Sequence, residues 1–197
     1  MLDTISPDLL RDLRQRHAEP QRFYHDWSHI EALLGHFRSI EALVHDKQGV
    51  LHAILFHDSV YDPRGHDNER KSAALLVETA PPIAATSLAL ARTAILATEG
   101  HTMPDADGEA ASDIAHFLDM DLAILGADEE RFDIYEGQVR REYAHVPEDA
   151  FRKGRAAVLE SFSARERLYF SDWGYERFEM KARDNLARSL AVLHAGN

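Results

Sequence analysis

The sequence predicts an all-α protein built as a bundle of helices. Apolar residues recur at helical spacing along most of the chain, short breaks rich in proline and glycine separate these segments, and none alternates with the period of two that marks a half-buried strand. At 197 residues the chain has the length of one domain. We therefore expect a single helical domain over residues 1–197, with a core at about 22–126 and a C-terminal helical extension at about 127–197.

Start signals predict three helices in the first part of the chain. Ser6 followed by Pro7 is typical of an N-cap with proline at the first helical position. Ser28-His29-Ile30-Glu31 has the spacing of a capping box, so a second helix is expected to begin at His29. Its apolar series is Leu33, Leu34, Phe37, Ile40 and Val44. A third helix is expected from about Lys47 to Asp58, because proline and glycine interrupt residues 60–65.

Three further helices are expected in the middle of the chain. Asn68 can cap a helix over residues 69–79, and Pro81-Pro82 is expected to open another that ends near Gly100. A polar loop follows at residues 103–108. Beyond it, Ser112 or Asp113 is expected to start a helix that ends at Gly126.

The C-terminal part predicts three longer helices. Asp128 can cap one that runs to about His145, Pro147 can initiate one that reaches Phe162, and the last is expected from Trp173 to Leu193. Apolar positions in this part suit either packing across the core or a homodimer face, and the sequence leaves both open. These positions include Phe151, Val158, Leu159 and Phe162.

Composition limits the class of partner. A formal net charge of −12 disfavours nucleic-acid polymers and anionic membranes, because binding to phosphate backbones depends on clustered Lys and Arg. The absence of cysteine excludes disulfides and thiolate ligands, so any metal must bind imidazole and oxygen. The chain shows no secretory signal and no apolar run of about 18 residues. We expect a soluble cytoplasmic protein that is compatible with a small anionic substrate.

The pair His57-Asp58 closes an almost wholly apolar segment, residues 50–56, and is the most informative feature of the chain. In a continuous helix Asp58 would share the apolar stripe of Leu51, Ile54 and Leu55. A carboxylate in that position must be paired, hydrogen-bonded or bound to a metal, because an unpaired buried charge costs several kcal/mol. A further histidine, His29, stands at the start of the preceding expected helix.

A third acidic candidate lies in the segment before Gly126. Asp121 shares a helical face with Phe117, Leu118 and Leu125, whereas Asp119 points to a different face and is the weaker choice. His29, His57, Asp58 and Asp121 would together form a mixed nitrogen and oxygen site with open positions for water. Such a site suits Mn, Co, Ni, Fe or Zn better than Ca, with Mg also compatible, as one or two ions.

These residues in this order resemble the H…HD…D motif of the HD domain superfamily of metal-dependent phosphohydrolases. Further likeness, to a small bacterial subgroup of uncharacterised HD proteins, covers most of the chain. It rests on residues 22–29, 56–63, 68–73, 119–126, 140–143 and 154–155. The resemblance implies an HD-type helical bundle that holds a divalent cation through His29, His57, Asp58 and Asp121, and hydrolyses a phosphoester with metal-activated water.

Three other residues are candidates for proton transfer or support of the site. His25 precedes His29 by four residues and is either a second-shell or substrate contact, or a structural hydrogen-bonding residue. His101 could act as an extra ligand or proton donor, or simply end its helix. Glu69 could act as a general acid or base, or owe its place to the helix dipole. Asp58 could also orient the attacking water.

Arg22, Arg140 and Arg155 could clamp phosphate through bidentate hydrogen bonds, or could merely balance charge in an acidic protein. The leading hypothesis is a metal-dependent phosphohydrolase whose substrate is a small phosphorylated compound such as a nucleotide. One alternative is a di-iron oxygenase on the same fold, which would need extra ligands such as His101 and His25. The other is a regulatory module that binds a metal and nucleotide without turnover.

Overall fold

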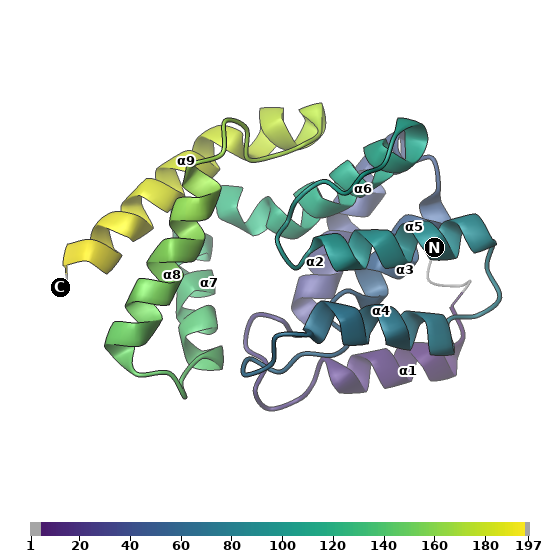
Figure 1. Ribbon diagram of the computed structural model, residues 1–197, viewed down its shortest axis with the longest axis horizontal. Helices are drawn as coiled ribbons and strands as arrows, with labels where there is room; N and C mark the ends of the chain where they lie inside the picture. Colours follow the sequence, from purple (N-terminus) through teal and green to yellow (C-terminus); the bar gives the residue numbers. More distant parts are fainter. Residues whose placement is uncertain (1–4, 196–197) are drawn as a thin grey trace. The chain divides into compact units, whose positions relative to one another are not determined.

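A computed structural model describes residues 5–195 and confirms the all-helical class, with no strand among those residues (Figure 1). The chain forms two compact units, the first ending at Met120 and the second beginning at Asp121. Each is described below by itself. The expectation of one domain over the whole chain stays a prediction, and its first four residues lie outside the described part.

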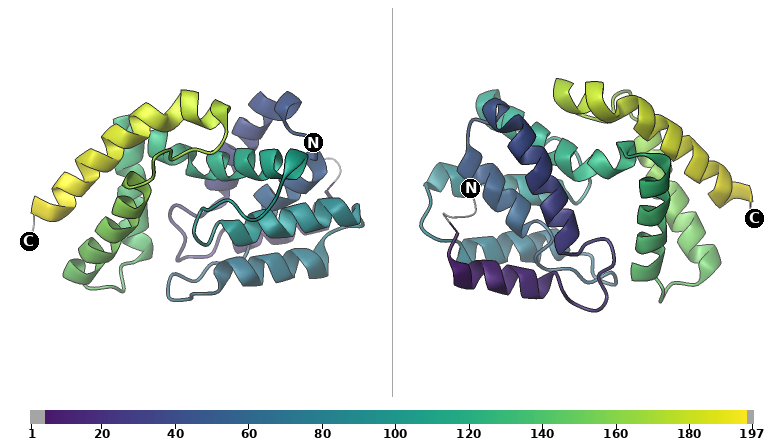
Figure 2. Two further views of the ribbon diagram at one scale, coloured as in Figure 1. Left: turned by 45° about the horizontal axis from the view of Figure 1, so that its top comes forward. Right: turned by 180° about the vertical axis from the view of Figure 1, so that it is seen from behind.

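The first unit is built around α3, which is buried on every side from Gly49 to Phe56. Helix α3 packs chiefly against α5, and also contacts α2 and α4 (Figure 2). A helix enclosed in this way has no polar face, which explains its continuous apolar sequence. The helices of this unit are α1 (Pro7–Arg16), α2 (Trp27–Ile40), α3 (Lys47–Phe56), α4 (Asn68–Thr79), α5 (Ala85–Ala97) and α6 (Gly108–Asp121), with the short 3-10 helix η2 (Glu41–Leu43) after α2.

Local chemistry explains where the first helices begin. The Ser6 side chain accepts a hydrogen bond from the Leu9 amide and Pro7 is the first helical residue, which confirms the predicted start of α1. The predicted start of α2 at His29 is wrong. Asp26 is the cap, because its carboxylate accepts from both the amide and the hydroxyl of Ser28, at 2.8 and 2.5 Å. His29 therefore lies within the first turn of α2.

Three other helices do not begin where the sequence predicted, although α4 begins only one residue early. The side chain of Asn68 binds the backbone of Asp62 in the preceding loop, and α4 follows Asp67 without a side-chain cap. Pro81-Pro82 lies in a loop, and α5 begins only at Ala85. Helix α6 begins at Gly108, well before Asp113.

Asp113 does not cap α6 but binds the backbone just before α3. Its carboxylate is fully buried and accepts hydrogen bonds from the amides of His45, at 2.9 Å, and Asp46, at 2.6 Å. Asp46 in turn caps α3 by accepting from the Gly49 amide. This connection fixes the N-terminal end of α3 against α6.

The second unit consists of η3 (Leu122–Gly126), α7 (Glu129–Glu142), α8 (Glu148–Ser163) and α9 (Asp172–Ala195). The 3-10 helix η3 packs mainly on α9, which also packs on α8. Tyr169 donates to the Leu122 carbonyl, and Asn185 donates to the carbonyls of Leu125 and Ala127. Because η3 is bound to α9 in this way, the second unit begins before the predicted boundary at residue 126.

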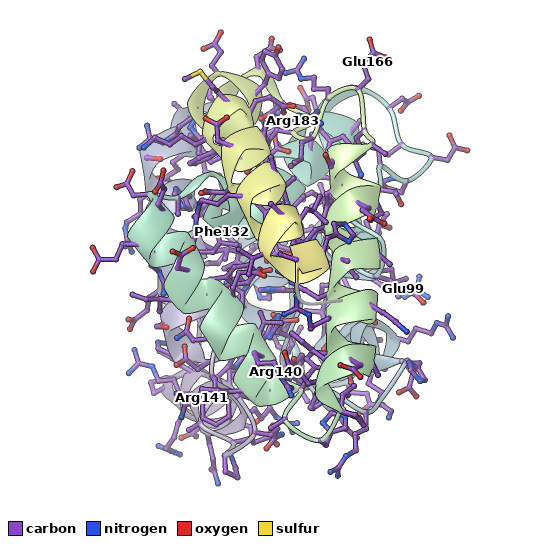
Figure 3. All side chains as sticks on the ribbon, turned by 90° about the vertical axis from the view of Figure 1, so that its left-hand side faces the viewer. Glu99, Phe132, Arg140, Arg141, Glu166 and Arg183 are labelled. Carbon is purple, nitrogen blue, oxygen red and sulfur yellow. The ribbon has the colours of Figure 1, made fainter. Side chains whose placement is uncertain are left out.

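The three C-terminal helices lie close to the predicted ranges. Figure 3 shows their side chains, with Phe132 and Arg140 labelled on α7 and Arg183 on α9. Asp128 precedes α7, but its carboxylate pairs with Lys181 on α9 and makes no cap hydrogen bond. Leu159 and Phe162 are buried within the unit, whereas Val158 is exposed. The homodimer face stays a prediction. Among the described residues, no helix combines the length and apolar character needed to cross a bilayer.

Candidate metal centre

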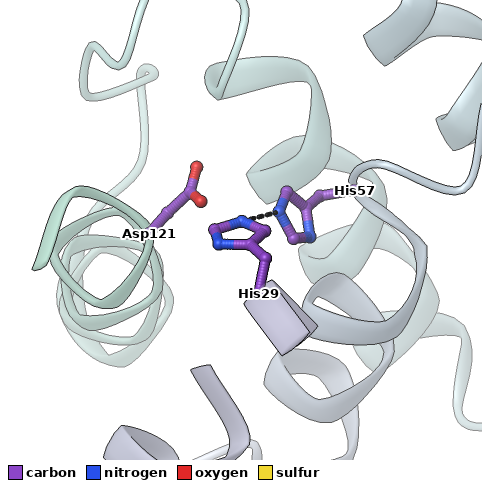
Figure 4. Close-up of side chains that lie close together, drawn as sticks. All are labelled: His29, His57 and Asp121. Atoms are coloured by element: carbon purple, nitrogen blue, oxygen red, sulfur yellow. Dashed lines mark hydrogen bonds between the residues drawn. The ribbon is translucent and has the colours of Figure 1, made fainter. Parts of the chain in front are cut away.

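His29 and His57 meet at the centre of the candidate site (Figure 4). His29 comes from the first turn of α2 and His57 from the C-cap of α3, and both side chains are buried. Their Nε2 atoms lie 3.1 Å apart. The Nδ1 atom of His57 lies 3.0 Å from the Ile54 carbonyl oxygen and donates to it, because a carbonyl can only accept.

Asp58 follows directly, in the turn beyond α3 rather than in the helix. Its Oδ2 atom lies 3.1 Å from Nε2 of His57 and 3.7 Å from Nε2 of His29. Because Asp58 lies beyond the end of the helix, its carboxylate can approach the ring of the preceding residue, His57. Burial alone would raise the pKa of the Asp58 carboxyl, but the charge and hydrogen bond of His57, with the charges of His25 and His29, hold that pKa well below its usual range.

Asp121 supplies the next carboxylate from the last residue of α6. One ligand atom from each of His29, His57 and Asp121 lies within 4.8 Å of the others, and these three residues could hold a metal ion (Figure 4). Asp119 is fully buried two residues earlier and is not one of the three. The structure therefore favours Asp121 over Asp119, which agrees with the helical-face argument.

The spacing of the donor atoms fits a metal ion. Two ligands that bind at about 2.1 Å and subtend about 90–109° are about 3.0–3.4 Å apart. The distances of 3.1 Å between the two Nε2 atoms and 3.1 Å from Nε2 of His57 to Oδ2 of Asp58 agree with this range. Without an ion, two imidazole lone pairs at this distance repel unless one nitrogen is protonated. A nitrogen and oxygen donor set suits the transition metals named above.

The side chain of Arg22 binds the backbone next to the site. Its buried guanidinium donates to three main-chain carbonyls, those of His25 at 3.0 Å, Asp58 at 2.7 Å and Ser59 at 3.5 Å, while Nε pairs with Glu19. These bonds join the segment before α2 to the turn after α3. Arg22 therefore holds together the two backbone segments that flank the site, and contact with phosphate stays a prediction for it.

His25 is half-buried beside the same turn. Its ring stacks on Tyr61 with centroids 4.4 Å apart, and lies 6.0 Å from the ring of His29. Its charge is among those that lower the pKa of Asp58, which places it near that carboxylate. His25 is thus the described histidine best placed to support the ligand set.

Arg140 and Arg155 act within the second unit. Arg140 donates to the carbonyls of Tyr143 and Val146 and pairs with Glu148, so it holds the turn between α7 and α8. Arg155 pairs closely with Glu136 and donates to Tyr135. Both have structural partners, and contact with phosphate stays a prediction for each. The cluster of Tyr135, Glu136 and Arg155 was not foreseen, because its partners lie on different helices.

Two predicted proton-transfer residues keep the status of predictions. Glu69 is half-buried in the first turn of α4, where the helix dipole favours a carboxylate. His101 lies in the turn after α5 with a φ of 45°, in the left-handed region that few residues other than glycine adopt. Such strain is common at functional sites but also at helix ends.

Comparison with known protein families, curated proteins and solved structures finds no match to this chain. The resemblance to the HD superfamily therefore rests on the sequence motifs alone. The metal-binding potential rests on the geometry of the gathered side chains.

Proposed function

We propose that the protein is a metal-dependent phosphoric ester hydrolase of the HD type that acts on a small phosphorylated compound such as a nucleotide. The observation that carries the proposal is that His29, His57 and Asp121 form a group that could hold a metal ion, with the Asp58 carboxylate 3.1 Å from Nε2 of His57. This donor set matches the motif that suggested the same chemistry from the sequence.

In this proposal His29, His57, Asp58 and Asp121 hold the ion. When bound, the ion would lower the pKa of a water and polarise a phosphoryl oxygen. The Asp58 carboxylate could also accept a hydrogen bond from the attacking water and orient its oxygen toward phosphorus. The phosphorus–oxygen bond to the leaving group then breaks, and that oxygen needs a proton. Glu69 and His101 are the candidate donors.

In this proposal the cation also offsets the negative charge of the protein, which opposes the binding of phosphate. With a formal net charge of −12, the protein as a whole repels anions such as phosphate. A divalent ion between two neutral imidazoles and two carboxylates offsets this repulsion locally and offers the phosphate an open coordination position. We therefore expect substrate affinity as well as turnover to depend on the metal.

The direct test combines metal analysis with a panel of phosphate esters, using protein loaded separately with Mn²⁺, Co²⁺, Fe²⁺, Zn²⁺ or Mg²⁺. We expect hydrolysis of at least one nucleotide or small phosphoester, lost together with metal content in His57→Ala and Asp58→Ala. His66→Ala, at an exposed histidine in the loop before α4, is the matched control and should retain both.

Three outcomes would contradict the proposal. Undiminished hydrolysis by His57→Ala would remove the site from the reaction. Two irons per chain with oxygen consumption would indicate oxidation instead of hydrolysis. Tight binding of a metal and nucleotide with no product from any ester would indicate a sensing module.

A further inference from the structure

Three side chains of the first unit, Arg22, His25 and Tyr61, form a ring stack beside the candidate histidine ligands. The ring of Tyr61 stacks on the imidazole of His25, with centroids 4.4 Å apart and planes inclined by 27°. The guanidinium of Arg22 lies over the Tyr61 ring, 5.3 Å from its centroid. Both kinds of contact are attractive and depend on how the rings are oriented. The ring of Tyr61 is therefore held in place by two neighbours.

The ring stack connects the two segments that carry the histidine ligands. Tyr61 lies in the loop between α3 and α4, shortly after His57 at the C-cap of α3. Arg22 and His25 lie in the loop between α1 and α2, just before His29 in the first turn of α2. A contact between these loops therefore acts on how the two ligands approach each other.

Hydrogen bonds to the main chain hold both sides of the ring stack. The side-chain amide of Gln21 donates to the carbonyl of Tyr61 at 3.2 Å. The guanidinium of Arg22 donates to the carbonyls of His25, at 3.0 Å, and Asp58, at 2.7 Å. The backbone on each side is thus anchored, and the stacked rings determine where the His25 imidazole lies between the two loops.

The ring stack reaches the ligand His29 through His25. The rings of His25 and His29 have centroids 6.0 Å apart, and the buried ring of Tyr24 lies 5.0 Å from the first and 4.8 Å from the second. Protein interiors are close-packed, so a void beside one ring lets its neighbours move. The Nε2 atom of His29 lies only 3.1 Å from that of His57, so a small rotation of either ring changes the ligand geometry (Figure 4).

We propose that Tyr61 is a positioning residue of the candidate metal centre: its ring holds His25 against His29 and thereby fixes the orientation of that ligand. The inference rests on the proposed function and extends it, because it gives a role to the loop that follows α3. Residues that orient metal ligands typically change metal affinity by about 10–100-fold when they are replaced. Because Tyr61 acts through His25, we expect an effect at the lower end of this range.

Co²⁺ is a suitable probe, because calorimetry gives its affinity and its visible absorption reports ligand geometry. We expect Tyr61→Leu, which removes the ring but stays apolar, to bind Co²⁺ about 10-fold more weakly than the unaltered protein, with a changed absorption spectrum. Tyr61→Phe keeps the ring and should bind Co²⁺ within about threefold of the unaltered protein.

Phe37→Leu is the matched control, because it removes a buried ring of the same unit about 12 Å farther along α2 from His29. It should lower the free energy of unfolding and leave the Co²⁺ affinity within about threefold of the unaltered value. A loss of affinity that merely follows a loss of stability would appear in this variant as well.

His25→Leu removes the other ring of the stack and keeps the inference testable if Tyr61→Leu folds poorly. It should also weaken Co²⁺ binding, and adding Tyr61→Leu to it should cause no further loss, because Tyr61 acts through His25. Unchanged Co²⁺ affinity in either folded single variant, equal weakening in Tyr61→Phe or Phe37→Leu, or additive losses in the double variant would overturn the role of Tyr61. Absence of Co²⁺ binding by the unaltered protein would instead refute the metal centre itself.

Discussion

His17 should make the stability of the fold depend on pH. It follows α1, is 1% exposed, and uses Nδ1 to contact the Leu13 carbonyl oxygen at 2.9 Å. Its Nε2 atom is buried with no hydrogen-bond partner, beside the edge of Trp27. Burial lowers the pKa of His17 from 6.5 to about 4, and Arg22 and His57 add to this, whereas the Leu13 carbonyl and Asp58 oppose it.

The sign and size of the effect follow from this lowered pKa. Above pH 6.5 the ring is neutral in both the folded and the unfolded chain, so His17 contributes no pH dependence there. Between pH 6.5 and about 4 only the unfolded chain takes up the proton, which favours unfolding. A difference of about 2.5 pKa units corresponds to a loss of about 3 kcal/mol once the pH is below 4, most of it by pH 4.5.

The measurement is the free energy of unfolding in urea between pH 7.5 and pH 4.5, with a chelator present so that metal binding does not contribute. We expect His17→Phe, which keeps a ring against Trp27 but cannot titrate, to lose about 2–3 kcal/mol less than the unaltered protein over this range. His66→Gln, at an exposed histidine, should lose as much as the unaltered protein. Equal losses in His17→Phe and the unaltered protein would refute the argument.

Three further predictions concern stability. Gly126→Ala should lower the free energy of unfolding in urea by about 1–3 kcal/mol, because the added Cβ would lie 2.6 Å from Cβ and 2.9 Å from Cα of Phe178. In Gly137→Ala the added Cβ meets nothing within 4 Å, so this change should raise the free energy of unfolding by about 0.5–1 kcal/mol. A change of the same sign in both variants would contradict this reasoning. Asp113→Ala should lower the free energy of unfolding, measured by thermal unfolding, by about 1–3 kcal/mol, because two backbone amides lose their acceptor. An unchanged free energy of unfolding would show that water replaces the carboxylate. Mn²⁺ at about 100 times its dissociation constant should raise the free energy of unfolding of the unaltered protein by about 2.7 kcal/mol and leave that of His57→Ala unchanged. An equal rise in both proteins would show that the ion binds elsewhere.

Local signals were enough to predict the helices but not all of their starts. The dipeptide Ser6-Pro7 and Pro147 mark starts correctly, because proline at these positions needs no partner from elsewhere in the chain. Asn68 and Asp113 have the right chemistry for caps, yet each bonds to another segment. A capping side chain can serve any backbone amide that the fold brings near, and sequence spacing does not reveal which one.

The same distinction applies to the candidate centre. His29, His57 and Asp121 could be found from the sequence, because a polar residue on an apolar face indicates a buried partner. The bonds from Arg22 to the carbonyls of His25 and Asp58 could not be found in this way. Those contacts depend on how loops and helices pack, and their residues follow no apolar pattern that would single them out.

The bonds of Arg22 have a consequence for how the centre can change. Its three acceptors near the site are all main-chain oxygens. The hydrogen bonds of Arg22 therefore do not depend on which side chains stand at positions 58 and 59. Asp58→Asn or Asp58→His would keep the turn in place while altering charge or donor type. The bonds that hold this turn are thus independent of the side chains gathered at the candidate site.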